Sequence, residues 1–235
     1  MDVIRDHDKF YLNEDRKLNT KEYFKFIVNH SSEFINYVPH NLSILDIGCA
    51  TGDFIFYLSK TFPQARLVGI DVMQDLLERA KNEVPDVTLI RSDISNKKSL
   101  PVDKFDAVFM LGVHTIFDDL FPVFDNAISL LKDQGRLYVF SFFNDSDIDT
   151  LVKVRTSSTN TAWQSGWNLF SKKSIMDYIE NKGMSCKFID WEIPIDIPKS
   201  HDPLRSWTFK DIQGKRLVIN GTGILHTFSL LEIVK

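Results

Sequence analysis

The chain has 235 residues, which is enough for one α/β domain with room for an insertion or a small cap. Hydrophobic residues make up 43% of it and charged residues 26%, as in ordinary soluble globular proteins. Its 28 basic and 32 acidic residues give a formal charge of −4, without the basic excess that is typical of nucleic-acid-binding proteins. We therefore expect a single domain over residues 1–235 and no nucleic-acid partner.

Individual segments exclude further classes of protein. The two cysteines, Cys49 and Cys186, lack paired spacing, so they predict neither a disulfide framework nor a zinc ribbon, and we expect no metal site. Residues 1–10 are charged, unlike a secretory signal. No apolar run reaches the roughly 18 residues that a membrane span needs. We expect a cytoplasmic protein without a membrane span.

Residues 1–40 are expected to form an N-terminal helical cap. After a charged stretch, Thr20 resembles a helix N-cap, and apolar residues at helical spacing follow it. A second short helix is expected over residues 32–38, because Pro39 would stop it.

The stretch from Ser43 to Leu58 organises the rest of the chain. Ser43 to Asp46 is expected to be a buried strand that ends in a carboxylate; a glycine-bearing turn follows, and an apolar helical run begins at Phe54. A strand, a tight glycine turn and a helix together bring backbone N–H groups and a helix N-terminus up to a ligand. The spacing is neither the phosphate loop G-x-x-x-x-G-K-[ST] nor a strict G-x-G-x-x-G.

The run from Leu45 to Asp53 reads LDIGCATGD, which resembles the first motif of class I S-adenosylmethionine (SAM) dependent methyltransferases. In that family the turn wraps the methionine part of the cofactor, and the resemblance implies that Asp46 contacts its amino acid moiety. Ala50 stands where the usual motif has its middle glycine. The turn residues to which the resemblance assigns cofactor contacts are Gly48, Cys49, Ala50 and Gly52.

A second strand is expected over residues 65–71, and it ends in Asp71. This acid follows the first turn by about 20 residues, where nucleotide-binding units place an acid for the ribose hydroxyls. A carboxylate suits that task because it accepts hydrogen bonds from two vicinal hydroxyls at once. The V-G-I-D segment matches the family's second signature and adds Val72 to the cofactor contacts, although NAD-binding proteins place an acid similarly. A helix is expected next, over residues 73–84.

Residues 87–94 are expected to form a third strand and its end. Asp93 resembles the family's aspartate that accepts a hydrogen bond from the adenine amino group, with Ile94 beside the ring. Asp46, Asp71 and Asp93 each stand at or just beyond a strand end. The carboxyl ends of parallel strands share one edge of a sheet, where ligands bind.

The fourth strand and its exit are expected over residues 105–114. F-D-x-V matches the family's pattern, which implies that Leu111 and Gly112 line the methionine end of the cofactor. His114 is the one titratable group expected near the transferable methyl, and a neutral imidazole could take a proton from an acceptor hydroxyl. The alternative is that His114 packs under the following helix or shapes the pocket.

The next elements are expected to be scaffold. Asp118 and Asp119 would stabilise the N-terminus of a helix that runs to Leu131, and Gly135 suits a left-handed turn before a fifth strand over residues 136–142.

A polar loop over residues 144–166 is longer than a plain connection and is expected to be functional or mobile. The candidate acceptor contacts in and next to it are Arg155, Trp163 and Trp167. Ser171 is expected to cap the last long helix, and a sixth strand is expected over residues 186–193.

Residues 194–223 form an insertion that is expected to cover the acceptor site, with residues 202–220 interpreted as a lid or a small ribbon. Arg205 and Trp207 are candidates for holding an anionic or sugar-like acceptor, through a bidentate contact and a stacking face. Equally, they would pin the insertion to the body. The last strand is expected over residues 224–234, with His226 packed in the sheet.

Four ordered signatures over residues 42–143 carry the resemblance. It implies a three-layer, Rossmann-like α/β methyltransferase fold, with a seven-stranded, mostly parallel sheet whose last strand is antiparallel and lies beside the fifth. The implied activity is SAM-dependent methyl transfer, which leaves S-adenosylhomocysteine.

The acceptor is expected to be a small molecule, because no N-P-P-Y or D-P-P-Y motif follows the fourth strand and the basic charge is low. A hydroxyl oxygen of a sugar or another metabolite is favoured. Two alternatives are a non-catalytic SAM-binding regulatory protein and a dinucleotide-dependent oxidoreductase. The latter requires G-x-G-x-x-G where this chain has G-C-A-T-G.

Overall fold

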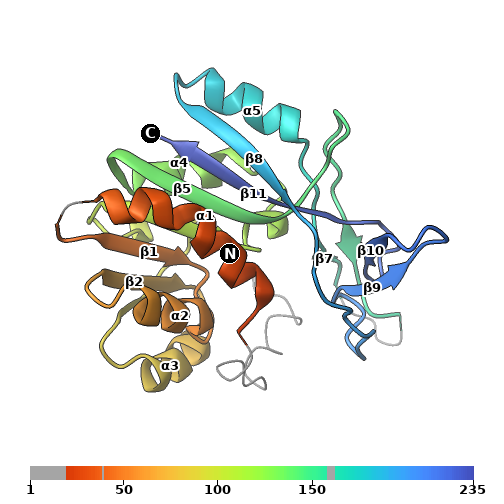
Figure 1. Cartoon of the computed structure of the whole chain (residues 1–235), viewed down its shortest axis with the longest axis horizontal. Helices are drawn as coiled ribbons and strands as arrows, with labels where there is room; N and C mark the ends of the chain where they lie inside the picture. Colours follow the sequence, from red (N-terminus) through yellow and green to blue (C-terminus); the bar gives the residue numbers. More distant parts are fainter. Residues whose placement is uncertain (1–19, 39, 158–161) are drawn as a thin grey trace.

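A seven-stranded sheet in the order β3-β2-β1-β4-β5-β11-β8 forms the centre of the protein (Figure 1). The computed structural model describes residues 20–38, 40–157 and 162–235. The elements, in chain order, are α1 (Glu22–Tyr37), β1 (Ser43–Ile47), α2 (Asp53–Thr61), β2 (Arg66–Asp71), α3 (Gln74–Glu83), β3 (Thr88–Arg91), the short 3-10 helix η2 (Lys97–Ser99), β4 (Phe105–Leu111), the 3-10 turn η3 (His114–Ile116), α4 (Phe121–Ser129), β5 (Leu131–Phe143), β6 (Lys153–Val154), β7 (Gln164–Ser165), α5 (Lys172–Glu180), β8 (Ser185–Trp191), β9 (Trp207–Lys210), β10 (Arg216–Ile219) and β11 (Thr227–Val234).

The sheet is parallel except for its last strand. β1 pairs in parallel with β2 and β4, β2 pairs with β3, and β4 pairs with β5. β11 lies between β5 and β8 and is antiparallel to both. The expected fold class is therefore confirmed. Because β1 to β5 all run the same way, they all end at the same edge of the sheet.

Helices cover both faces of the sheet, with α1 and α2 in front of it and α4 behind it in Figure 1. On β1, Ile44 packs with buried residues of α1 and α2, whereas Leu45 packs with those of α4 and α5. All five residues of β1 are buried, since a central parallel strand is covered on both sides. Successive side chains alternate between the faces, so Asp46 shares the face of Ile44, toward α1 and α2.

The α1 segment is one helix of 16 residues where the sequence predicts two. The hydroxyls of Ser31 and Ser32 donate to carbonyls one turn back within the helix, so these polar side chains do not interrupt it. The predicted N-cap at Thr20 is also wrong, because Lys21 holds that position, in an extended conformation and without a side-chain capping bond. Residues 1–19 of the predicted cap lie outside the described part of the chain.

The segment that leads into β5 differs from the prediction, which is a helix to Leu131, a left-handed turn at Gly135 and a strand over residues 136–142. The strand begins at Leu131, and its pairing with β4 shifts register between Phe105 and Ala107. Gly135 is not the left-handed residue; Gln134 is, with φ of 62°. Gly135 is needed for space, because a Cβ there would lie 3.0 Å from two backbone carbonyl oxygens.

Two expected helix caps have different outcomes. Ser171 caps α5 as predicted, and its Oγ accepts from the N–H groups of Lys173 and Ser174. Asp118 does not cap α4, which begins three residues later. Its carboxylate instead accepts from Lys153 Nζ at 2.5 Å and from the Ser165 hydroxyl at 3.0 Å, so it holds the β6–β7 segment against the exit of β4.

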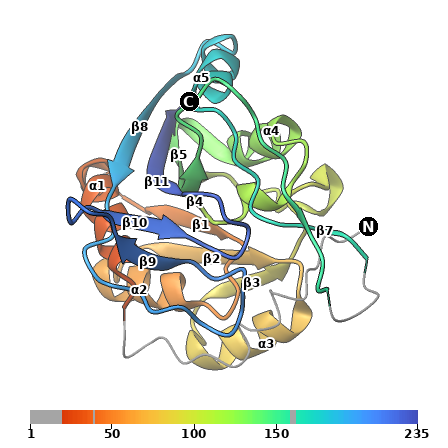
Figure 2. The same cartoon turned by 90° about the vertical axis from the view of Figure 1, so that its right-hand side faces the viewer.

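The insertion over residues 194–223 contains an antiparallel ribbon, in agreement with the ribbon interpretation. Trp207 at the start of β9 pairs with Ile219 at the end of β10. Thr208 ties the ribbon to the preceding segment, since its Oγ1 accepts from the Ile197 N–H at 2.8 Å. In Figure 1 the ribbon lies to the right of the sheet, and in Figure 2 it lies in front of β1 and β2. Both views put it beyond the edge at which the parallel strands end.

Candidate functional site

A cavity opens at the carboxyl ends of β1, β2 and β4, beside the start of α1. It contains about 1130 Å³ of space that is continuous with solvent. Crevices outside the carboxyl ends of parallel strands are the usual ligand sites of such sheets. Nine of the eleven residues expected to contact the cofactor line it: Asp46, Gly48, Cys49, Ala50, Asp71, Val72, Ile94, Leu111 and Gly112.

The turn after β1 is fixed to the neighbouring strand by its backbone. The N–H groups of Gly48 and Cys49 both donate to the Ile70 carbonyl, at 2.8 and 3.0 Å. Gly48 has a φ of +72°, and a Cβ there would lie 2.3 Å from a methyl of Val113. Only glycine fits this position, because any side chain would meet both backbone strain and a direct clash.

Asp71 holds this turn from β2. Its Oδ2 accepts from the Ala50 N–H at 2.9 Å, and its Oδ1 accepts from the Met73 N–H at 2.9 Å. The side chain is largely buried but still lines the cavity. Because each carboxylate oxygen has more than one lone pair, the group can fix the two loops and still accept from a ligand.

Three carboxylates make the first cavity suitable for a positively charged ligand: Asp46, Asp53 and Asp71. Burial, and after it the charge of Asp71, raises the pKa of Asp46 well above its usual value, while Lys21 opposes the rise. A cationic ligand beside Asp46 would favour its ionised form. Burial and the same two acids also raise the pKa of the Cys49 thiol, which makes it a poor nucleophile and a packing residue.

Two of the expected cofactor residues lie outside the cavity wall. Gly52 is the N-cap of α2 and has a left-handed conformation. A Cβ there would lie 3.3 Å from the Cβ of Ala80 on α3, so the absence of a side chain lets α2 and α3 pack closely. The Asp93 carboxylate accepts from the N–H and hydroxyl of Ser95, at 2.8 and 2.7 Å, and its neighbour Ser92 lines the cavity instead.

His114 does not lie where the sequence suggests a general base. The imidazole is fully buried, stacks on Phe143 at 4.6 Å between ring centroids and lies 3.3 Å from the Phe142 carbonyl oxygen through Nε2. Burial lowers its pKa to about 4. It lines neither cavity described here, so the packing alternative agrees with its position and the catalytic role does not.

A second cavity of about 660 Å³ adjoins the first, and the two share Lys21, Tyr23, Gly112 and Trp167. Its remaining lining residues come from β5, the start of β11 and the insertion: Ser141, Phe142, Phe228, Leu204, Arg205 and Ser206. The Trp167 indole N–H donates to the Leu204 carbonyl at 2.7 Å and so joins the loop before α5 to the insertion. Trp167 and Arg205, both expected to contact the acceptor, thus lie in one wall.

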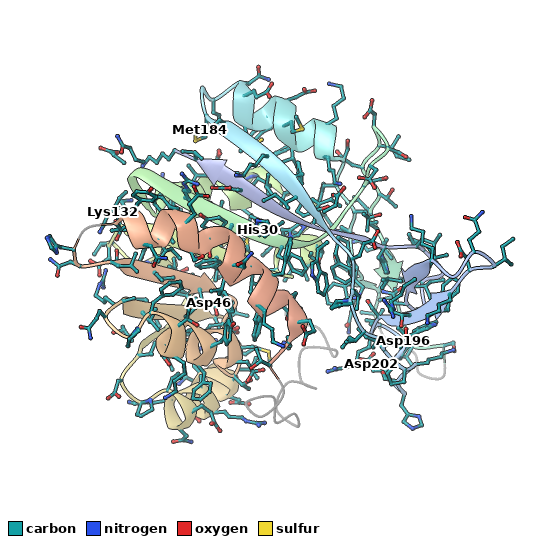
Figure 3. The ribbon with its side chains drawn as sticks, viewed as in Figure 1. His30, Asp46, Lys132, Met184, Asp196 and Asp202 are labelled. Atoms are coloured by element: carbon teal, nitrogen blue, oxygen red, sulfur yellow. The ribbon has the colours of Figure 1, made fainter. Side chains whose placement is uncertain are left out.

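The other expected acceptor contacts lie elsewhere. Trp207 lines neither cavity, and the Lys199 ammonium lies 4.8 Å from its ring centroid. The Arg155 guanidinium covers the exposed Trp163 ring at 4.8 Å, also outside both cavities. Figure 3 labels Asp46, which lies in the sheet beside the first cavity, and Asp202, which lies in the insertion on the right.

Lys21 and Tyr23 line both cavities but were not singled out in the sequence. Lys21 is the N-cap of α1 and Tyr23 belongs to its first turn, and the packing of this helix on the sheet brings both to the strand ends. The Tyr23 ring stacks on Phe140 of β5 at 5.1 Å. No local motif marks these residues, because their position depends on how α1 docks.

Within the described residues, no group of three or more His, Cys, Asp or Glu side chains could hold a metal ion. Of the helices in those same ranges, none is long and apolar enough to span a bilayer.

Comparisons with known proteins identify the family of this chain. The family model described as "Methyltransferase domain" matches residues 39–183. The chain is 27% identical over 187 residues to malonyl-[acyl-carrier protein] O-methyltransferase 1 of Ilyobacter polytropus. This match covers 77% of this chain and 68% of that protein. It is 31% identical over 96 residues to trans-aconitate 2-methyltransferase of Escherichia coli, over 41% of this chain and only 37% of that protein.

Solved structures share the whole fold. An S-adenosylmethionine-dependent methyltransferase from Clostridium acetobutylicum superposes with a TM-score of 0.62 at 15% identity, and the match covers 98% of this chain and 99% of that one. Other structures of this fold hold SAM or S-adenosylhomocysteine.

The family match covers more than half of the chain, so the protein belongs to the methyltransferase-domain family. The chain is therefore a methyltransferase. The dinucleotide-dependent oxidoreductase alternative is excluded.

Proposed function

We propose that the first cavity binds SAM through the residues that the sequence motifs single out. The Gly48–Ala50 turn would hold the methionine part, Asp46 and Asp53 would lie near its cationic groups, and Asp71 would accept from the ribose hydroxyls. The fit is supported by Gly112: it lines the cavity with a φ of +79°, and apart from its chain neighbours a Cβ there would meet no atom of the described residues within 4 Å. The space that a side chain would fill is left for a ligand.

The bound cofactor supplies a methyl group on a positively charged sulfur, which a nucleophile attacks from the side opposite the sulfur. The chain's own contribution is therefore mainly to hold two molecules in line. Backbone N–H groups and buried carboxylates are well suited to this, because bonds in the sheet and the turn already fix their positions.

The second cavity is proposed to hold a small-molecule acceptor that is methylated on oxygen. The single observation that carries this is that the two cavities meet at Gly112 and Trp167. An acceptor in the second cavity would then face the cofactor without any rearrangement of the sheet. The insertion over residues 194–223 would cover it, since Leu204, Arg205 and Ser206 form part of the wall. The O-methyltransferase name of one relative agrees with an oxygen acceptor.

A hydroxyl acceptor, which the sequence favours, requires a group that removes its proton as the bond to the methyl forms. His114 is buried behind Phe143 and lines neither cavity. A hydroxyl would therefore have to lose its proton to another group or to water.

The test is transfer of an isotope-labelled methyl from SAM to a defined library of small alcohols, acids and amines, followed by comparison of two tryptophan variants. Trp167→Phe removes the 2.7 Å bond to the insertion and should raise the acceptor KM. Trp207→Phe is the matched control, because Trp207 lies in the insertion that Trp167 contacts but lines neither cavity. Equal kinetics in the two variants would contradict the acceptor assignment. SAM binding without methylation of any library member would support a binding or regulatory protein.

A further inference from the structure

The second cavity combines apolar walls with positive charge. Its aromatic lining comes from Tyr23, Phe142, Trp167 and Phe228. Among the described residues, the lining includes two cations, Lys21 and Arg205, and no acid.

Arg205 is held in place by its own segment. Its Nε lies 3.6 Å from Asp202 Oδ2, and the Asp202 side chain is largely buried and does not line the cavity. The Asp202 Oδ1 also accepts from the Leu204 N–H at 3.0 Å, which stiffens the short turn that carries Arg205. A guanidinium positioned in this way is suited to a planar anion, because its N–H groups form a fork that matches two oxygens of one carboxylate.

Lys21 lies at the junction of the two cavities, where it also opposes the charge of Asp46. An acceptor between Lys21, Arg205 and the cofactor's cationic sulfur would have positive charge on three sides. Surrounded by aromatic rings, these charges act through a lower dielectric than in water, so their attraction for an anion is stronger.

From this arrangement, and resting on the proposed function, we infer that the methylated group is a carboxylate, which Arg205 and Lys21 orient and which leaves as a methyl ester. A lone pair of one carboxylate oxygen forms the new O–C bond while the C–S bond breaks and its electron pair stays on sulfur. The anion and the sulfonium are both neutralised, and no proton moves.

This class of acceptor also agrees with the absence of histidine and carboxylate side chains from the described lining of the second cavity. A carboxylate is already ionised at neutral pH, whereas an alcohol must lose a proton during attack. The acids nearby line the first cavity, and both His114 and His226 lie outside the two linings. The side chains present are therefore sufficient for ester formation.

The experiment supplies labelled SAM with matched series of straight-chain and aryl carboxylic acids and the corresponding primary alcohols and amines. Methyl esters release labelled methanol in mild alkali, while methyl ethers and methylamines do not. We expect alkali-labile product from the acids. Alkali-stable product alone would overturn the carboxylate inference and leave methyl transfer to a small molecule intact. No transfer to any member, with S-adenosylhomocysteine binding retained, would overturn the proposed function as well.

Variants of the whole protein separate binding of the anion from folding. Arg205→Gln should raise KM for the best acid about 10- to 100-fold, the loss expected for a charge-assisted contact, with unchanged S-adenosylhomocysteine affinity. Arg205→Lys should recover part of the loss. Lys210→Gln is the control, because Lys210 lies in the same insertion, is exposed and has its Nζ 3.8 Å from Asp196 Oδ2 rather than at the cavity. Identical KM values for Arg205→Gln and Lys210→Gln would overturn the assignment of Arg205.

Discussion

Replacing Gly112 with alanine tests the cofactor cavity while disturbing the fold little. The residue lines both cavities, and apart from its chain neighbours an added Cβ would meet no atom of the described residues within 4 Å, so the new methyl would project into the space that we assign to the ligand. Its φ of +79° costs an alanine about 1–2 kcal/mol of folding free energy. For a chain of this size that corresponds to a fall in Tm of about 2–8 °C.

Gly183 provides a matched control for this variant. It has a φ of +73°, and a Cβ there would also meet nothing within 4 Å, but it lies between α5 and β8 and lines neither cavity. Gly183→Ala should therefore lose similar stability and no ligand affinity. Forcing a methyl into a filled site costs about 1–3 kcal/mol, so Gly112→Ala should bind S-adenosylhomocysteine about 5- to 150-fold more weakly.

Isothermal titration calorimetry with S-adenosylhomocysteine, together with thermal unfolding of both variants, measures the two effects. Equal affinities in the two variants would refute the position that we assign to the cofactor. A collapse of Gly112→Ala far beyond the fall in Tm of Gly183→Ala would show that the space around Gly112 is filled by protein.

Two further predictions concern Asp71 and His226. Asp71→Asn should weaken S-adenosylhomocysteine binding by about 1.5–3 kcal/mol, since a charge-assisted bond to the ribose is lost; unchanged affinity by calorimetry would remove Asp71 from the ribose site. Burial lowers the pKa of His226 to about 4, so between pH 6.5 and 4 the unfolded chain binds more protons than the folded one, and stability falls as the pH falls. Between pH 7.5 and 5 this single group accounts for about 2 kcal/mol of that loss. The His226→Leu variant should therefore lose about 2 kcal/mol less than the parent in urea unfolding, and parallel losses would contradict the assignment.

Local signals in the sequence point to residues that line the first cavity because the features that build it are themselves local. A buried run that ends in Asp46, a glycine that only a left-handed turn tolerates at Gly48, and a second strand that ends in Asp71 are all visible as short patterns. The parallel order of β1, β2 and β4 then brings these ends to one edge of the sheet.

Short sequence patterns could not predict contacts between segments that are distant in the chain. Trp167 meets Leu204 across 37 positions in the chain, and Lys21 reaches the strand ends only because α1 crosses the sheet. His114 shows that closeness in sequence does not ensure closeness in space. It follows Gly112 closely in sequence, but the 3-10 turn η3 carries its imidazole onto Phe143 and away from both cavities.

The two cavities carry opposite charges, which should make the affinity for the acceptor depend on the ligand in the cofactor site. The first cavity is lined by three acids and the second by two cations, and Lys21 is shared by both. An anionic acceptor should therefore bind more tightly when the cofactor site holds a cation at the position of the sulfur. S-adenosylhomocysteine has a neutral sulfur, and sinefungin carries an ammonium group in place of the sulfonium methyl.

Two opposite charges about 4 Å apart at an effective dielectric of about 20 attract by at most about 4 kcal/mol, and solvent at the cavity mouth reduces this. Titration of a carboxylic acid into the sinefungin complex should give a lower Kd than titration into the S-adenosylhomocysteine complex, and added salt should narrow the difference. The corresponding alcohol should show no preference. If the acid binds both complexes equally, its carboxylate does not face the sulfur. If it does show the preference, the same charge change explains product release, because methyl transfer removes the anion and the sulfonium together.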